Sequence, residues 1–166
     1  MSEPDRLDQI DRRLLALLRE DGRASIVDLA RQVNLSKTPC TERVRRLERL
    51  GFIRGYRADL DAGKLGFGYK VFVQVTLEKT TTDVLTRFNA AVRAVPEIRA
   101  CHMVAGGFDY LLMVRVRDMT HYRDVLGDAI GALPGVSQTH TYPVMETVRD
   151  ERDLAGEVIL APSRSE

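Results

Sequence analysis

The chain has 166 residues, of which 44% are hydrophobic and 30% charged, and its formal net charge is +1. This length suits one domain or two small ones with a real core. No apolar run approaches the roughly 20 residues of a membrane span, and the polar, acidic first residues exclude a signal peptide. The two cysteines, Cys40 and Cys101, lie far apart, which favours a reduced, cytoplasmic protein with no membrane partner.

A first helix is predicted between Asp8 and Gly22. Asp8 is followed three positions later by Asp11, which is typical of a helix start, and Gly22 ends the pattern. Apolar residues recur between these limits at the spacing of one helical face, namely Ile10, Leu14, Leu17 and Leu18.

Residues 25–51 predict two further helices joined by a tight turn. Ser25 and Asp28 make a start similar to a capping box, and an apolar face follows at Ile26, Leu29, Ala30 and Val33. After the interruption at Asn34-Leu35, Ser36 is a good N-cap for the next helix, which Gly51 ends. Pro39 falls in the first turn, where its missing N–H breaks no helical bond.

The outward side of this last helix is strongly basic. Residues 37–57 contain seven Lys and Arg against two Glu, a local net charge of +5 in a chain of net +1. A charge run is often only a solvated face, but two such helices also form the helix-turn-helix that places its second helix in the DNA major groove. We expect contacts to base edges from Thr38, Thr41, Glu42 and Arg45, and contacts to phosphates from Arg43, Arg46, Arg49 and Arg54. Ser36 and Lys37 complete the predicted DNA-binding set.

A domain boundary is predicted after this helix. Phe52–Ala58 has the pattern of a short strand, and a polar connector with three glycines follows from Asp59 to Gly68. We therefore assign residues 1–58 to a helix-turn-helix, winged-helix-like domain that binds double-stranded DNA, and residues 59–68 to a linker.

Residues 69–149 predict a second module with an internal repeat. Phe88, Val92, Val95, Pro96 and Ile98 are matched 38 residues later by Leu126, Ile130, Leu133, Pro134 and Val136. Strands are expected at 69–77, 98–104, 110–116 and 136–146, and helices at 83–94 and 120–132. This β-α-β-β-α-β order is the ferredoxin-like arrangement, so the whole chain is of the α+β class. The sheet's other face should be buried by a second subunit, and residues 150–166 remain as a tail.

The loop between the two middle strands could hold a ligand. Gly106 and Gly107 allow close approach to the backbone, whose N–H groups could bind a carboxylate while Asp109 takes an ammonium. A plain hairpin turn explains the same composition equally well. Catalysis has little support: His102, His121 and His140 lie apart without metal-ligand spacing, and nucleophile or nucleotide motifs are absent. We expect no catalytic residue, metal site or cofactor, and packing roles for both cysteines.

With these residues assigned, the chain resembles the Lrp/AsnC (feast/famine) family of transcription regulators over about residues 7–148. The resemblance rests on LDQIDRRLLALLREDGR, LSKTPCTERVRRLERLGFIRGY and AGGFDYLL, each at the family's place in the fold. It implies a DNA-binding head and a ligand-sensing module that forms homodimers assembling into tetramers or octamers. By position, the family's amino-acid effector site falls on Met103, Val104, Ala105, Gly106, Gly107 and Asp109, with Thr139 and Thr141 lining the same cleft.

Two segments, CHMVAGGFDYLLMVRVRDM and ALPGVSQTHTYPVME, are most similar to the regulators that activate proline dehydrogenase genes. This implies proline as the leading effector, with leucine or another apolar amino acid behind it. The alternatives are an enzyme related to the sirohaem decarboxylases, which share the scaffold, and an architectural DNA-binding protein without an effector.

Overall fold

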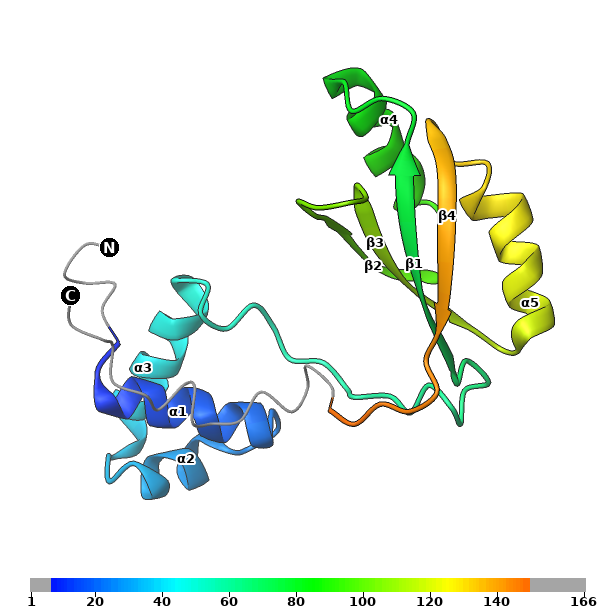
Figure 1. Cartoon of the computed structure of the whole chain (residues 1–166). Coiled ribbons are helices and arrows are strands. Elements are labelled where there is room, and N and C mark those ends of the chain that lie inside the picture. The colour runs from blue at the N-terminus through cyan, green and yellow to red at the C-terminus, as the bar shows by residue number, and fades with distance from the viewer. Residues whose placement is uncertain (1–6, 150–166) are drawn as a thin grey trace. The chain divides into compact units, whose positions relative to one another are not determined.

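The computed structural model describes residues 7–149. The chain divides into two compact units (Figure 1): the first contains the residues up to Asp59 together with Val148 and Arg149, and the second contains Leu60–Thr147. The predicted tail at 150–166 lies outside the described residues. Within the described part, no helix is both long and apolar enough to cross a membrane.

The first unit is built from helices α1 (Gln9–Glu20), α2 (Ile26–Gln32) and α3 (Lys37–Arg49) (Figure 1). Helix α1 begins with the predicted cap, because the Asp8 side chain accepts from the Asp11 N–H and the Asp11 side chain accepts from the Asp8 N–H. The apolar stripes of the helices meet in one core, which contains Leu14, Leu17, Leu29, Ala30, Val33, Cys40, Val44 and Leu47. The sequence spacing predicted this core face correctly.

The turn between α2 and α3 explains why the two helices stay separate. Asn34 has a φ of +54°, the left-handed conformation that Asn tolerates better than most residues and that cannot continue a helix. Ser36 occupies the N-cap position of α3, but its side chain makes no capping hydrogen bond. The prediction of a Ser36 cap was therefore right in position and wrong in interaction. At the other end, Gly51 adopts a φ of +76° and ends α3 as expected.

The strand predicted at Phe52–Ala58 is not formed. A strand needs a neighbour to pair with, and the first unit contains only helices in its described residues. Two contacts within the unit hold this segment instead: the Ile53 N–H donates to the Leu47 carbonyl over 3.2 Å, and the Tyr56 hydroxyl donates to Glu48 Oε1 over 2.9 Å. Burial and the Glu48 carboxylate raise the pKa of Tyr56 to about 12.

The second unit has the predicted order of strands and helices. It consists of β1 (Tyr69–Leu77), α4 (Thr82–Val92), β2 (Ile98–Met103), β3 (Tyr110–Val116), α5 (Met119–Asp124), η2 (Val125–Ile130) and β4 (Val136–Pro143). The strands form one antiparallel sheet in the order β2-β3-β1-β4. The second predicted helix is divided, because η2 continues α5 with π-helical geometry.

One face of this sheet is buried by the helices. Val71, Val73, Val75 and Leu77 of β1 alternate inward and share a core with Phe88 and Val92 of α4 and with Tyr122, Val125 and Ile130 of α5 and η2. No helix of the described residues covers the opposite face. Phe72 is flanked there by Met113 on one side and Tyr142 on the other, with Leu111 beside Gln74. The period of two along each strand separates these two faces.

Candidate nucleic-acid interface and ligand loop

Helix α3 presents a polar stripe directly opposite its buried side. Cys40, Val44 and Leu47 point into the core. With 3.6 residues per turn, the opposite stripe consists of Thr38, Glu42, Arg45 and Arg49, all of which are exposed. The stripe thus combines hydrogen-bonding groups near the helix start with cations further along.

The other predicted DNA contacts lie beside this stripe. Ser36 and Lys37 are exposed at the start of α3, and the Ser36 hydroxyl has no hydrogen-bond partner among residues 7–149. Thr41 is half-buried, and its hydroxyl donates to the Lys37 carbonyl over 2.9 Å. Arg54 is exposed just beyond the end of the helix. The helix fixes the position of the stripe, whereas the position of Arg54 depends on the segment that follows Gly51.

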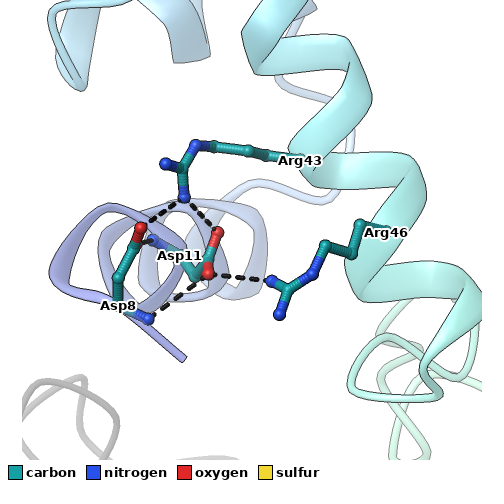
Figure 2. A network of polar contacts seen from close by, with 4 residues as sticks. All are labelled: Asp8, Asp11, Arg43 and Arg46. Carbon is teal, nitrogen blue, oxygen red and sulfur yellow. Dashed lines mark hydrogen bonds and ion pairs between the residues drawn. The ribbon is translucent and has the colours of Figure 1, made fainter. Parts of the chain in front are cut away.

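Arg43 and Arg46, which the sequence assigned to phosphates, form ion pairs inside the unit (Figure 2). Arg43 Nη1 donates to Asp8 Oδ2 over 2.6 Å and to Asp11 Oδ1 over 2.8 Å. Arg46 Nη1 donates to Asp11 Oδ2 over 3.0 Å. The Asp11 side chain exposes 2% of its surface, and those of Arg43 and Arg46 expose 31% and 28%. Helix α3 is therefore tied to the start of α1 by a buried carboxylate between two arginines.

The electrostatics of this cluster agree with its geometry. Burial alone would raise the pKa of the Asp8 carboxyl, but the hydrogen bond from the Asp11 backbone and the Arg43 guanidinium hold that pKa below its usual value. The hydrogen bond to Asp8 in turn raises the pKa of Arg43, against the effect of burial. Both shifts favour the charged forms of Asp8 and Arg43. By formal charge, the two carboxylates and the two guanidinium groups of the cluster cancel.

This cancellation changes the charge of the predicted DNA-binding surface. Asp8 and Asp11 border a concavity of about 810 Å³ together with Glu42, Arg45 and Arg49 of the exposed stripe. Subtracting these two acids from the +5 of residues 37–57 leaves a net charge of +3. Sequence reasoning treated Asp8 and Asp11 only as a helix start and missed their contact with α3. The available signal was an acid pair with the same helical spacing as Arg43 and Arg46.

The loop between β2 and β3 is closed by Asp109. The Asp109 carbonyl accepts from the Val104 N–H, and the Asp109 N–H donates to the Val75 carbonyl, each over 3.0 Å. In addition, Asp109 Oδ2 accepts from the Leu77 N–H over 2.7 Å. Asp109 therefore fastens the loop to the end of β1, which is the role expected of a hairpin-turn residue.

The backbone between these anchors is open. A Cβ atom at Gly106 or Gly107 would meet nothing within 4 Å, and neither residue has a positive φ. Among the described residues, their N–H groups have no hydrogen-bond partner. No contact within residues 7–149 thus requires glycine at either position. Met103, Val104 and Ala105 lead into this open segment from the end of β2.

Thr139 and Thr141 lie on the helix-covered face of β4. They pair with Val75 and Val73, whose side chains are in the core. The Thr141 and Tyr122 hydroxyls share a hydrogen bond of 2.6 Å, which ties Thr141 to α5. Thr139 lies across β1 from Tyr110, at the end of the sheet where the loop begins. Of the two threonines, Thr139 is thus the closer to the loop.

The histidines and cysteines, all within residues 7–149, do not form a cluster. His121 Nε2 lies 3.6 Å from Glu97 Oε1, while His102 and His140 are exposed on separate strands. Cys40 is buried and Cys101 half-buried, and burial raises the pKa of both thiols. Across residues 7–149, no three His, Cys, Asp or Glu side chains are grouped as a metal site requires.

Comparison with known proteins assigns both units. Residues 7–54 match the winged helix-turn-helix DNA-binding model, and residues 70–154 match the Lrp/AsnC ligand binding domain. The leucine-responsive regulatory protein of Salmonella typhimurium is 53% identical over 148 residues, which cover 89% of this chain and 90% of that protein. The chain belongs to the Lrp/AsnC family.

Solved structures of Lrp/AsnC-like regulators share the fold. A transcriptional regulator of Neisseria meningitidis in complex with L-Met superimposes with a TM-score of 0.83 at 32% identity, covering 87% of this chain and 94% of that one. An AsnC family regulator of Agrobacterium tumefaciens gives a TM-score of 0.82 at 32% identity with the same coverage. The chain is a DNA-binding transcriptional regulator and not an enzyme of the sirohaem decarboxylase type.

The buried carboxylate yields a stability prediction. Asp11→Asn removes the negative charge that both arginines share, and we expect the free energy of unfolding to fall by about 2–3 kcal/mol, less than for fully buried pairs because the arginines can reach water. Arg31→Gln is the control, because it breaks the exposed ion pair of Arg31 with Asp28. It should change the free energy of unfolding by less than about 0.5 kcal/mol. Chemical denaturation measures both. Equal effects would show that the Asp11 cluster does not stabilise the unit.

Proposed function

We propose that this regulator reads DNA with the exposed stripe of α3 and changes its DNA binding in response to an amino acid. The observation that carries the first part is the stripe itself, because its residues face away from the core while neighbouring Arg43 and Arg46 are held by carboxylates. In a helix-turn-helix the start of the second helix meets base edges. Thr38, Glu42 and Arg45 are then the reading residues, assisted by Ser36 and Thr41.

Phosphate contacts fall to the cations that remain outside the cluster. Arg49 is exposed in the stripe, and Lys37 and Arg54 are exposed beside it. Long cationic side chains at these places reach the backbone on either side of a groove. Arg43 and Arg46 contribute to phosphate binding only as far as Asp8 and Asp11 release them. This division predicts a smaller salt dependence than the +5 of the sequence would suggest.

We propose further that two chains associate through the open face of the sheet. Phe72, Leu111, Met113 and Tyr142 place apolar surface on one side of a sheet whose other side is already packed. A second copy of the same face would bury this surface. Such a dimer carries two heads, which read major grooves about 34 Å apart on a pseudo-palindromic operator. Tetramers or octamers follow if dimers associate further.

The proposed effector site is the open backbone at Gly106 and Gly107. Their N–H groups, unpartnered within the described chain, suit an amino-acid carboxylate, and the oxygen of Asp109 that does not bind Leu77 suits the ammonium. Thr139 is the nearer of the two threonines to the loop, and Met103 supplies an exposed apolar side chain. Two similar proteins support an apolar amino acid as the effector. The Salmonella typhimurium relative is a leucine-responsive regulatory protein, and the Neisseria meningitidis regulator was solved in complex with L-Met. Proline remains the proposal from the resemblance to proline dehydrogenase activators.

An effector regulates only through a difference in affinity. An amino acid bound at the loop shifts the assembly if it binds one arrangement of subunits more tightly than another, and by no more than that difference. The open loop fits this requirement, because a neighbouring subunit can complete its walls in one assembly and leave them open in another.

Two substitutions separate base reading from phosphate binding. Arg45→Ala should cost about 1–3 kcal/mol at a selected operator and relax its sequence preference, whereas Arg49→Ala should weaken binding to all sequences and reduce the salt slope by about one. Fluorescence anisotropy over a series of salt concentrations measures both. Identical salt slopes in wild type and both variants would contradict the assignment of Arg49.

The effector proposal predicts a ligand-dependent melting temperature. In a thermal-shift screen against the twenty amino acids, one or a few apolar ones, with proline and leucine first, should stabilise the protein by about 2.7 kcal/mol at 100 times their Kd. Gly107→Val should keep the fold, since a side chain there meets open space, and should lose the shift. Asp109→Ala should melt earlier even without ligand, because it removes the bond to Leu77. No shift from any amino acid would favour an effector-free architectural protein.

The dimer proposal predicts that a charge on the open face separates the subunits. Met113→Glu places a carboxylate among apolar side chains, and we expect a lower molecular mass by light scattering with the helix-covered core intact. Glu in place of exposed Thr86 on α4 is the matched control. A Met113→Glu protein with unchanged mass would show that this face is not the interface.

A further inference from the structure

The charge of Asp8 is not needed for its structural role. Asp8 Oδ1 accepts the Asp11 N–H over 2.8 Å and thereby caps α1, while the other oxygen, Oδ2, holds Arg43 Nη1 over 2.6 Å (Figure 2). An N-cap needs one accepting oxygen, which Asn or Ser supplies equally well. The second oxygen and the negative charge therefore act on Arg43 alone.

Arg43 is also held without Asp8. Its Nη1 lies 2.8 Å from Asp11 Oδ1, and Asp11 is buried whereas the Asp8 side chain is 50% exposed. Nη2 and Nε of Arg43 have no partner among residues 7–149. Asp11 thus anchors the guanidinium, and Asp8 covers it from the solvent side. A DNA phosphate would approach from that same side, because Asp8 borders the concavity with Arg45 and Arg49.

We propose that the Asp8 carboxylate substitutes for a DNA phosphate at Arg43 and so limits the affinity of this protein for DNA. The inference rests on the proposed DNA-reading face of α3. Binding to DNA of any sequence depends mainly on the number of phosphates that cations neutralise. By occupying Arg43 and placing a negative charge on the same surface, Asp8 removes one such contact. The protein then depends more on the reading residues Thr38, Glu42 and Arg45 for tight binding.

The test compares full-length variants on a random-sequence duplex, where phosphate contacts dominate. Asp8→Asn keeps a capping oxygen and removes the charge. Asp21→Asn is the matched control, since it makes the same charge change at the other end of α1, roughly 20 Å away at 1.5 Å per residue. Fluorescence anisotropy at several salt concentrations gives the affinity and the salt slope. Thermal melting checks that each variant is folded. If Asp8→Asn does not fold, Asp8→Ser takes its place, because Ser also supplies a capping oxygen.

We expect Asp8→Asn to bind the duplex several-fold more tightly than Asp21→Asn at low salt, with a salt slope steeper by about 0.9, the value for one additional phosphate contact. Arg43→Gln in the wild-type background should change the affinity little, because Arg43 is already occupied. In the Arg43→Gln background, Asp8→Asn should bind no more tightly than Asp21→Asn does in that background.

Three results would overturn the inference. Unchanged or weaker binding by Asp8→Asn would make Asp8 a residue that positions Arg43 for DNA. If Asp8→Asn raised the affinity equally in the wild-type and Arg43→Gln backgrounds, the effect of Asp8 would be only general repulsion between its carboxylate and DNA. A large loss of affinity in Arg43→Gln alone would show that Arg43 already contacts phosphate in the wild type. Failure of the wild type to bind any duplex would instead reject the DNA-reading face itself, so the two failures are distinguishable.

Discussion

The buried carboxylate of Asp11 is the constraint on which the DNA-binding unit depends. A charged group removed from water costs several kcal/mol unless it is paired, and Asp11 is paired with two arginines of another helix. Any arrangement in which α1 and α3 separate or slide past each other would leave this charge unpaired and would therefore be less stable. Because Arg43 and Arg46 occupy one flank of α3, their attachment also decides which residues remain to face DNA.

In the ligand-binding unit the corresponding constraint is the alternation of side chains along the sheet. The valines of β1 must all enter the core, so Phe72 and its neighbours on β3 and β4 must all face the other way. Among residues 7–149, two features are left without a partner: an apolar sheet face, and the N–H groups of Gly106 and Gly107. In the proposed dimer and effector site, these outward groups bind the partners while the core is unchanged.

Several polar residues that the sequence assigned to external partners have partners within the chain. Arg43 and Arg46 bind Asp11, Asp109 binds the Leu77 N–H, and Thr141 binds Tyr122. A charged or hydroxylated side chain looks the same in a sequence whether its partner is a phosphate, a ligand or another residue. In the Asp11 cluster the partners are separated by 32 and 35 residues, so only the packing of α1 against α3 brings them together. The predicted strand at Phe52–Ala58 failed for a related reason, since pairing needs a neighbour that the unit does not contain.

The helices and strands that formed, and the sides they bury, could be predicted because they follow from local spacing: three or four residues along a helix, two along a strand, and capping or turn residues at the ends. This spacing predicted the observed limits of β1 and β3 and separated the exposed stripe of α3 from its core side. Which charges lie opposite one another depends on how the helices pack. Electrostatic and hydrogen-bond partners depend on distances of about 3 Å between atoms, and the order of residues does not specify such distances across a fold. The net charge of the candidate DNA-binding surface, the ion pair between Asp8 and Arg43 and the fastening of the β2–β3 loop therefore became visible only in three dimensions.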